Sequence, residues 1–332
     1  HLIIHRLFIK LTRLYIHDSA ILNYICAMHI CYKSITVFLM SVLLFAGCTE
    51  PKDDGKITIA CTTGIVADCI RNIVSEEVEV IALMGAGVDP HLYKASQGDI
   101  AKLSTADIIV YNGLHLEGKM AKMLENYSKQ KPVFALGNYI PKEQLKRVDK
   151  TSDLVDPHIW FNPQVWMTGL QGVAEELSLQ NPALKDCRER FTVYNLKVEK
   201  LTHSLQSQLD STLPVERRIL ITSHDAFEYF GDAFSFEVRG LQGISTAAEY
   251  GAKDVKNMID FIVKNQVKSV FVETSVSNKN LEAVIEGAGA LNYELTIGGT
   301  LYSDALGTAG TSQGTYTGML EANINTIIKG LQ

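Results

Sequence analysis

Short apolar runs alternate with amphipathic stretches along the first half of the chain, beginning at residue 56. Buried strands are predicted for the apolar runs at 56–61, 78–83, 107–112 and 132–135. Helices are predicted for the stretches between them, at 64–74, 97–104 and 117–128. Strands that alternate with helices in this way are typical of a parallel α/β sheet.

The second half of the chain repeats this scheme. Its predicted strands are 218–222, 234–238, 269–273 and 294–297, and its predicted helices are 252–265, 278–288 and 314–329. No convincing repeat is visible at the level of individual residues. The predicted fold class is therefore α/β, with two similar lobes that each contain a mostly parallel sheet.

Between the halves lies the most periodic segment of the chain, residues 181–214. Its apolar residues recur every three or four positions, which places them on one face of a helix. Asn181 suits the N-cap, Pro182 suits the first helical position, and Pro214 ends the pattern. A helix of about 30 residues is about 45 Å long, long enough to join the two lobes as one rigid rod.

This pattern divides the folded part of the chain into a first lobe (56–180), a linking helix (181–214) and a second lobe (215–332). A two-chain coiled coil is the alternative for the periodic segment. It is disfavoured because one helix of this length, flanked by α/β units, can pack on its own lobes. We therefore expect a monomer.

Residues 1–47 are expected to be an upstream segment and a signal peptide, with Met28 as the true start. Lys33, an apolar run at 35–45 and two small residues follow the order of a secretory signal. The apolar run is shorter than a transmembrane span.

Residues 45–48, Phe-Ala-Gly-Cys, resemble a bacterial lipobox, in which signal cleavage leaves a lipidated N-terminal cysteine. Cys48 is therefore expected to carry the lipid, and the polar stretch 48–55 to be a tether. An ordinary cleaved signal or a signal anchor is the alternative. The chain is expected to lie outside the cytoplasm, held at the membrane on the periplasmic face or the cell surface.

Charge and cysteine content narrow the class of protein further. The formal net charge of −6 offers no basic surface, so no nucleic-acid partner is expected. Of the six cysteines, Cys61, Cys69 and Cys187 lie in the folded part, an odd number without metal-finger spacing. No disulfide framework is indicated, and Cys61 and Cys69 are expected to be small core residues.

Three histidines and one aspartate are candidates for a single metal site: His91, His158, His224 and Asp304. Two of the histidines follow Asp-Pro, and His224 follows the predicted strand 218–222 at its carboxyl end, where α/β folds place ligand sites. Each lobe supplies two of the four, so a cleft between the lobes can gather them. For any one histidine, a turn in which the ring caps a backbone carbonyl is the alternative.

Three imidazoles and a carboxylate form a complete ligand set for a divalent transition metal, with no position left for water. A closed site favours holding a metal over catalysis, so no catalytic residue is assigned. Imidazole nitrogen favours Zn²⁺, while a bidentate Asp304 would raise the coordination number and suit Mn²⁺. Both ions stay open.

Four further residues are candidates for contact with these ligands. Asp225 is placed to orient the ring of His224, since metal-bound histidines usually have a second hydrogen-bond partner. Arg239 is a candidate partner for Asp304, or an ordinary surface residue. Glu249 and Glu273 lie near a loop and a strand end, and are either neighbours of the ligands or solvated carboxylates.

The chain resembles the zinc- and manganese-binding lipoproteins of bacterial ABC importers, the TroA-like cluster A-I of solute-binding proteins. The resemblance extends from residue 56 to 331, and its most specific segments are 87–93, 156–160, 222–227, 240–246, 271–275 and 302–306. It implies that the four candidates above are the ligands of a metal bound in the interlobe cleft. It also implies that the linking helix limits closure of the two lobes.

The resemblance does not select the metal. Some manganese-dedicated relatives carry Glu at the position of His224, and zinc-dedicated relatives often add a His-rich loop between the first two ligands. This chain has neither, since only His115 lies between residues 93 and 156.

These observations together predict an extracytoplasmic receptor, not an enzyme, that binds Zn²⁺ or Mn²⁺ as cargo. Its expected partners are the permease and ATPase of an ABC importer. A secreted zinc metallohydrolase is the alternative of another class, but it would need an open coordination position and a general base. A metal-binding surface adhesin or a metallochaperone is compatible with the same site.

Overall fold

The computed structural model describes residues 56–148, 153–248 and 250–332. The expectations for the signal peptide, Met28, Cys48 and the tether lie outside these residues, as does the one for Glu249. Within the described ranges, every helix is too short or too polar to cross a membrane.

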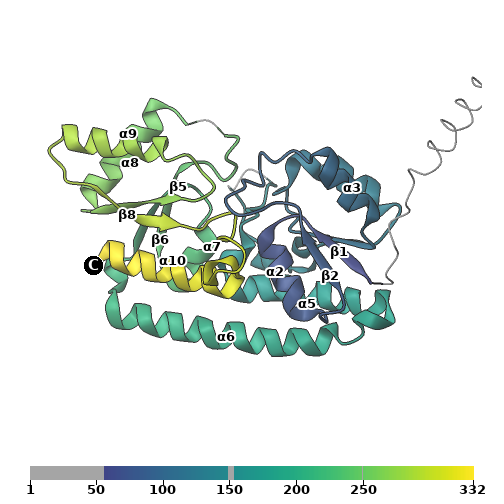
Figure 1. Ribbon diagram of the computed structural model, residues 1–332. Coiled ribbons are helices and arrows are strands. Elements are labelled where there is room, and N and C mark those ends of the chain that lie inside the picture. The colour runs from purple at the N-terminus through teal and green to yellow at the C-terminus, as the bar shows by residue number, and fades with distance from the viewer. Residues whose placement is uncertain (1–55, 149–152, 249) are drawn as a thin grey trace, which may run out of the picture. The chain divides into compact units, whose positions relative to one another are not determined.

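The first lobe is a four-stranded parallel sheet in the order β2-β1-β3-β4 (Figure 1). Its strands are β1 Thr58–Cys61, β2 Glu79–Ala82, β3 Ile108–Tyr111 and β4 Val133–Ala135. Its helices are α2 Gly64–Ile73, α3 Gln97–Thr105, α4 Ala121–Ser128 and α5 Pro163–Gln180. Ile59 and Val110 pack into the cluster that contains α2 and α5, while Ala60 and Ile109 face α3 and α4. Because neighbouring residues of a strand point to opposite faces, both faces of the sheet are buried.

The second lobe has the same strand order, β6-β5-β7-β8, again fully parallel. Its strands are β5 Ile219–His224, β6 Glu237–Gln242, β7 Ser269–Glu273 and β8 Thr296–Leu301. Its helices are α7 Glu228–Phe234, α8 Ala252–Lys264, α9 Lys279–Ala290 and α10 Tyr316–Leu331. The predicted fold class is confirmed, and the two lobes repeat one topology although their sequences show no repeat.

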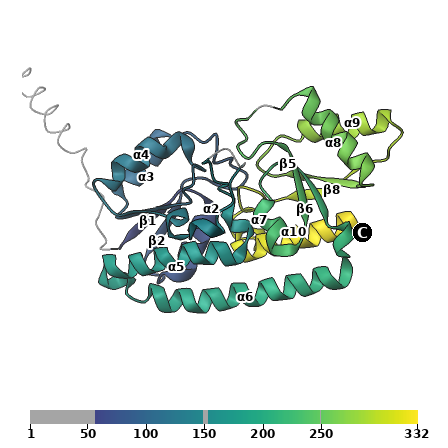
Figure 2. The same cartoon turned by 180° about the vertical axis from the view of Figure 1, so that it is seen from behind.

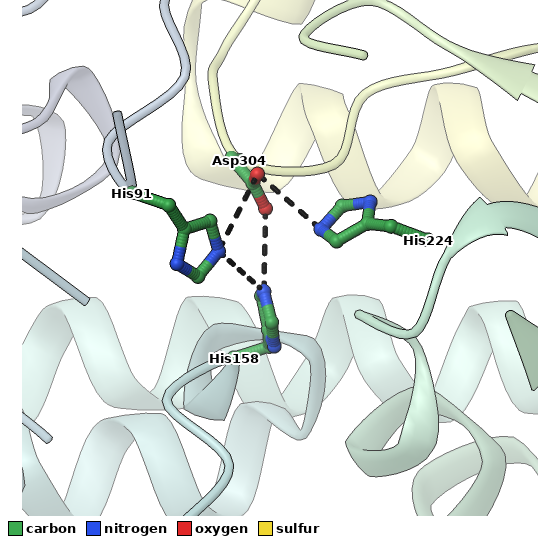
Figure 3. Close-up of side chains that lie close together, drawn as sticks. All are labelled: His91, His158, His224 and Asp304. Carbon is green, nitrogen blue, oxygen red and sulfur yellow. Dashed lines mark hydrogen bonds and ion pairs between the residues drawn. The ribbon is translucent and has the colours of Figure 1, made fainter. Parts of the chain in front are cut away.

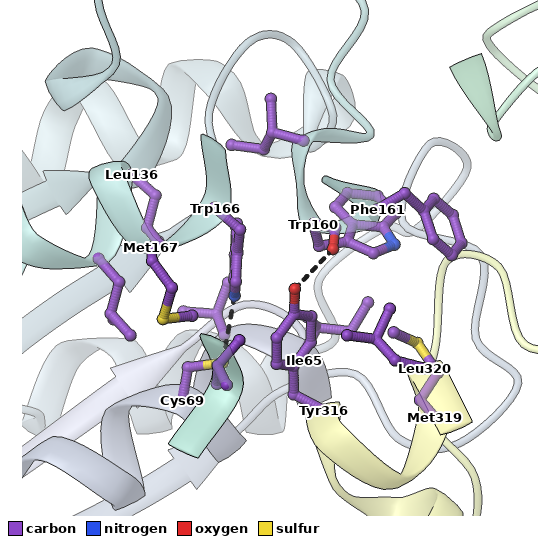
Figure 4. Close-up of a cluster of buried hydrophobic side chains, with 14 of the residues drawn as sticks. Ile65, Cys69, Leu136, Trp160, Phe161, Trp166, Met167, Tyr316, Met319 and Leu320 are labelled. Carbon is purple, nitrogen blue, oxygen red and sulfur yellow. Dashed lines mark hydrogen bonds between the residues drawn. The ribbon is translucent and has the colours of Figure 1, made fainter. Parts of the chain in front are cut away.

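The linking helix α6 comprises Cys187–Thr212 and runs along both lobes (Figures 1 and 2). It begins later than predicted, because the Asn181 side chain accepts a hydrogen bond from the Ala183 amide and caps a separate 3₁₀ turn, Pro182–Leu184. The helix packs on α2 and α5 of the first lobe and on α10 of the second. One hydrophobic cluster contains residues of all four helices, so the lobes share a core. Figure 4 shows side chains of this cluster from α2, α5 and α10.

Two helices were absent from the prediction, α5 and α7. Gly169 and Gly172 weaken the helical pattern of α5 in the sequence. In the structure, α5 approaches Tyr139 so closely that a Cβ at Gly172 would lie 2.3 Å from Cγ of Tyr139, which is why glycine is required there. The predicted strand at 234–238 began too early, because Phe234 still belongs to α7. Ser235 then ends α7 in the left-handed conformation, with φ of 60°.

Gly240 of β6 provides a test of how the second lobe packs around His224. A Cβ at this position would lie 2.3 Å from the Asp225 amide nitrogen and 2.5 Å from the His224 carbonyl carbon. We expect Gly240→Ala to lower the free energy of unfolding by about 1–3 kcal/mol, because the backbone at 224–225 must move. Urea unfolding measures this change.

The matched control is Gly243→Ala, whose Cβ would lie 3.5 Å from the Cβ of Ala248, an ordinary contact. Equal unfolding free energies for the two variants would show that the close approach at Gly240 is not a constraint.

Candidate metal centre

The structure brings the four predicted ligand residues together between the lobes (Figure 3). One ligand atom from each of His91, His158, His224 and Asp304 lies within 4.8 Å of all the others. His91 comes from the loop after β2, His158 from the loop before a 3₁₀ turn at Ile159–Phe161, His224 from the end of β5, and Asp304 from the loop after β8. His224 and Asp304 lie at or just beyond the carboxyl ends of parallel strands.

The separations between the inward-facing atoms suit one bound ion. Asp304 carboxylate oxygens lie 3.4 Å from Nε2 of His224, 3.5 Å from Nε2 of His158 and 3.9 Å from Nε2 of His91. The Nε2 atoms of His91 and His158 are 3.2 Å apart. Tetrahedral ligands at about 2.0–2.1 Å from a zinc ion lie about 3.4 Å from one another. The geometry therefore needs little adjustment to accept a metal.

The candidate site is closed to solvent. The relative exposure of His91 is 6%, and that of the other three residues is 1% or less. Among the described residues, neither oxygen of Asp304 nor the Nε2 atom of His224 has a hydrogen-bond partner. Buried polar atoms without partners are costly, and a central cation would be a partner for all of them.

Carboxylates hold the outer nitrogen of two imidazole rings. Glu273 accepts a hydrogen bond from the His224 backbone amide at 2.9 Å, and its other oxygen lies 2.5 Å from Nδ1. Asp156 accepts from the backbone amide of His158 at 2.9 Å and lies 2.7 Å from its Nδ1. When the ring carries a proton on Nδ1 alone, Nε2 can offer its lone pair to an ion at the centre of the site, and these carboxylates favour that tautomer.

The pKa values of the site follow from burial and from these neighbours. Burial opposes the charged form of His224, but the carboxylates of Glu273 and Asp304 outweigh it and hold its pKa well above the usual value. Burial lowers the pKa of His91 to about 3. Burial acts to raise the pKa of Asp304, but the imidazole of His224 outweighs it and holds that pKa below its usual range.

Of the four residues expected near the ligands, Glu273 does contact a candidate ligand, His224. The expectation for Asp225 was wrong, because Glu273 occupies Nδ1 of His224; burial instead raises the pKa of Asp225 to about 6. The expectation for Arg239 was also wrong. Arg239 is exposed, pairs with Glu237 at 3.1 Å and stacks over Phe261.

Asp156 is the contact residue that the prediction missed. The signal was present in the Asp-Pro-His motif itself, because an Asp side chain commonly bonds to the backbone two residues on. Asp89 makes the same bond to the His91 amide at 2.8 Å, but its other oxygen accepts from the Thr246 hydroxyl of the second lobe at 2.6 Å. The other two histidines of the described residues, His115 and His203, are exposed and do not belong to this group.

Comparison with known proteins identifies close relatives. The family model for zinc-uptake complex component A, periplasmic, matches residues 59–330. The manganese-binding lipoprotein MntA of Bacillus subtilis is 42% identical over 304 residues, which is 89% of this chain and 99% of MntA. The zinc-binding protein TroA of Treponema pallidum is 41% identical over 286 residues, or 86% of this chain and 92% of TroA. The solved TroA structure superimposes with a TM-score of 0.79, covering 83% of this chain and 99% of TroA.

The contact between Glu273 and His224 generates a test of the site. In Glu273→Gln the side-chain amide would donate a hydrogen bond to Nδ1, which moves the ring proton to Nε2 and blocks its lone pair. We expect affinity for Zn²⁺ and Mn²⁺ to fall by about 10- to 100-fold, measured by calorimetric titration.

Glu237→Gln is the matched control, since Glu237 lies on β6 and, within the described ranges, its side chain pairs only with the exposed Arg239. Unchanged affinity in Glu273→Gln would show that this carboxylate does not set the tautomer of His224.

Proposed function

This chain belongs to the family of zinc-uptake complex component A, and we propose that it captures Zn²⁺ or Mn²⁺ outside the cytoplasm and delivers the ion to an ABC permease. The observation that carries the proposal is the enclosed set of three imidazoles and one carboxylate. Relatives named for manganese and for zinc, MntA and TroA, support a metal ion as the cargo.

We propose His91, His158, His224 and Asp304 as the ligands of the transported ion. Their four donor atoms complete a tetrahedral shell, which leaves no coordination position for a reactive water and favours transport over hydrolysis. The ion is therefore cargo, and the chemistry required of the protein is reversible binding.

Both metals remain substrates in this proposal. The two relatives, one named for manganese and one for zinc, are 42% and 41% identical to the chain, so similarity does not separate the ions. Three nitrogen ligands favour Zn²⁺ by ligand type. Both oxygens of Asp304 lack hydrogen-bond partners among the described residues, so a bidentate mode that suits Mn²⁺ is also open.

We also propose that the protein is a monomer anchored through a lipid on Cys48. MntA and other relatives are named lipoproteins, which supports the lipobox prediction at residues 45–48. The shared core of the two lobes and α6 supports a helix that serves its own lobes and not a partner chain.

Metal binding should stabilise the folded protein. An ion at 100 times its dissociation constant adds about 2.7 kcal/mol to the free energy of unfolding, which raises Tm by about 5–10 °C. We expect Zn²⁺ and Mn²⁺ each to produce this shift in metal-free protein, and a chelator to reverse it, as measured by differential scanning calorimetry.

His158→Ala should abolish the shift, whereas His203→Ala, which changes an exposed histidine on α6, should leave it intact. If the wild-type protein binds neither ion with sub-micromolar affinity, the proposed function is wrong. Metal-dependent hydrolytic activity would favour the metallohydrolase instead.

The lipid anchor has its own test. Replacing the cysteine in Cys48→Ser removes the thiol that accepts the lipid, so the protein should move from the membrane fraction to the soluble extracytoplasmic fraction and lose radiolabelled palmitate. Retention in the membrane fraction would indicate an uncleaved signal anchor.

A further inference from the structure

The side chain of Trp160 contacts the candidate ligand His158 and also the residue that precedes the candidate ligand Asp304. Its ring packs edge-on against the ring of His158, with centroids 5.3 Å apart and planes at 69°. Its indole Nε1–H donates to the carbonyl oxygen of Ser303 at 3.0 Å, and Ser303 immediately precedes Asp304. One residue of the first lobe thus contacts His158 directly and the Asp304 loop of the second lobe.

Tyr316, the first residue of α10, holds Trp160 from below. Its hydroxyl donates to the carbonyl oxygen of Trp160 at 2.8 Å (Figure 4). Its backbone amide donates to Oδ2 of Asp68, a residue of α2, at 2.8 Å. Trp160 and Tyr316 are 1% and 0% exposed, so water does not compete for these bonds.

A second contact holds the residue before Ser303. The side chain of Asn323 in α10 accepts from the Tyr302 amide at 2.9 Å and donates to the Tyr302 carbonyl oxygen at 2.8 Å. Helix α10 therefore holds Tyr302 directly, and it holds Ser303 through Tyr316 and Trp160. These contacts connect His158 to Asp304, whose carboxylate lies 3.5 Å from Nε2 of His158.

We propose that Trp160 is a positioning residue for the cargo site: with Tyr316, it sets the separation between His158 and Asp304 across the two lobes. This inference rests on the proposed function, because it concerns the geometry of the same site. It makes half of the coordination shell preformed before the ion arrives, so that less ordering opposes binding. A residue that only fills the core would affect stability and leave metal coordination unchanged.

Two variants separate these roles. Trp160→Phe keeps an aromatic ring against His158 and loses the N–H bond to Ser303, while Tyr316→Phe removes only the hydroxyl that holds the Trp160 carbonyl. We expect both to lose about 10- to 100-fold in affinity for Zn²⁺ and Mn²⁺. With Co²⁺ as a probe, the visible absorption should weaken, since its intensity reports how many ligands surround the ion and in what geometry.

The matched control is Tyr194→Phe. The Tyr194 hydroxyl is buried in the same core and contacts only the sulfur of Cys69, at 3.7 Å, among the hydrogen bonds of the described chain. It should keep wild-type affinity and the wild-type Co²⁺ spectrum, whatever its effect on Tm.

Wild-type affinity and spectrum in Tyr316→Phe and Trp160→Phe would overturn the positioning role while leaving the proposed function standing. If Trp160→Phe does not fold, Tyr316→Phe decides the question, because it deletes a single oxygen atom. A wild-type protein that binds no metal would instead refute the proposed function.

Discussion

The structure depends on one electrostatic constraint: three imidazoles and a carboxylate are buried together with their donor atoms facing one another. Such a set is costly in a protein interior unless a cation lies among them. His158, His224 and Asp304 are almost fully excluded from water, so solvent cannot serve as that partner. The same atoms that are costly to bury without a cation would provide the free energy of ion capture.

The fold meets this constraint by directing the carboxyl ends of two parallel sheets toward a common point. Neither lobe has a complete ligand set, so the lobes must be held at a constant separation. A core shared by α2, α5, α6 and α10 joins the two lobes. Arg218 fastens the end of α6 to the second lobe. Its fully buried guanidinium donates hydrogen bonds to the Leu213 and Phe234 carbonyl oxygens and to Asp210.

Much of the architecture was predictable because apolar periodicity reports which face of an element is buried. The strand at Ser269–Glu273 matched its prediction at both ends, and most helices differed by one to three residues. The four site residues were predictable because residue type and the Asp-Pro-His motif restrict the chemistry. Helix α5 was missed because its glycines serve packing against a distant turn, which no local pattern contains.

The sequence by itself determined the elements, their alternation and the four side chains able to bind a metal, since these follow from local pattern and residue chemistry. Only the tertiary structure decided which carboxylate meets which ring. His224 is followed by Asp225 in the chain, yet its Nδ1 lies against Glu273, because β5 and β7 are parallel neighbours whose carboxyl ends meet. Arg239 is paired in register with Ile221, three residues before His224, and so lies away from that edge. Contacts of this kind depend on strand order and register, which adjacent residues do not encode.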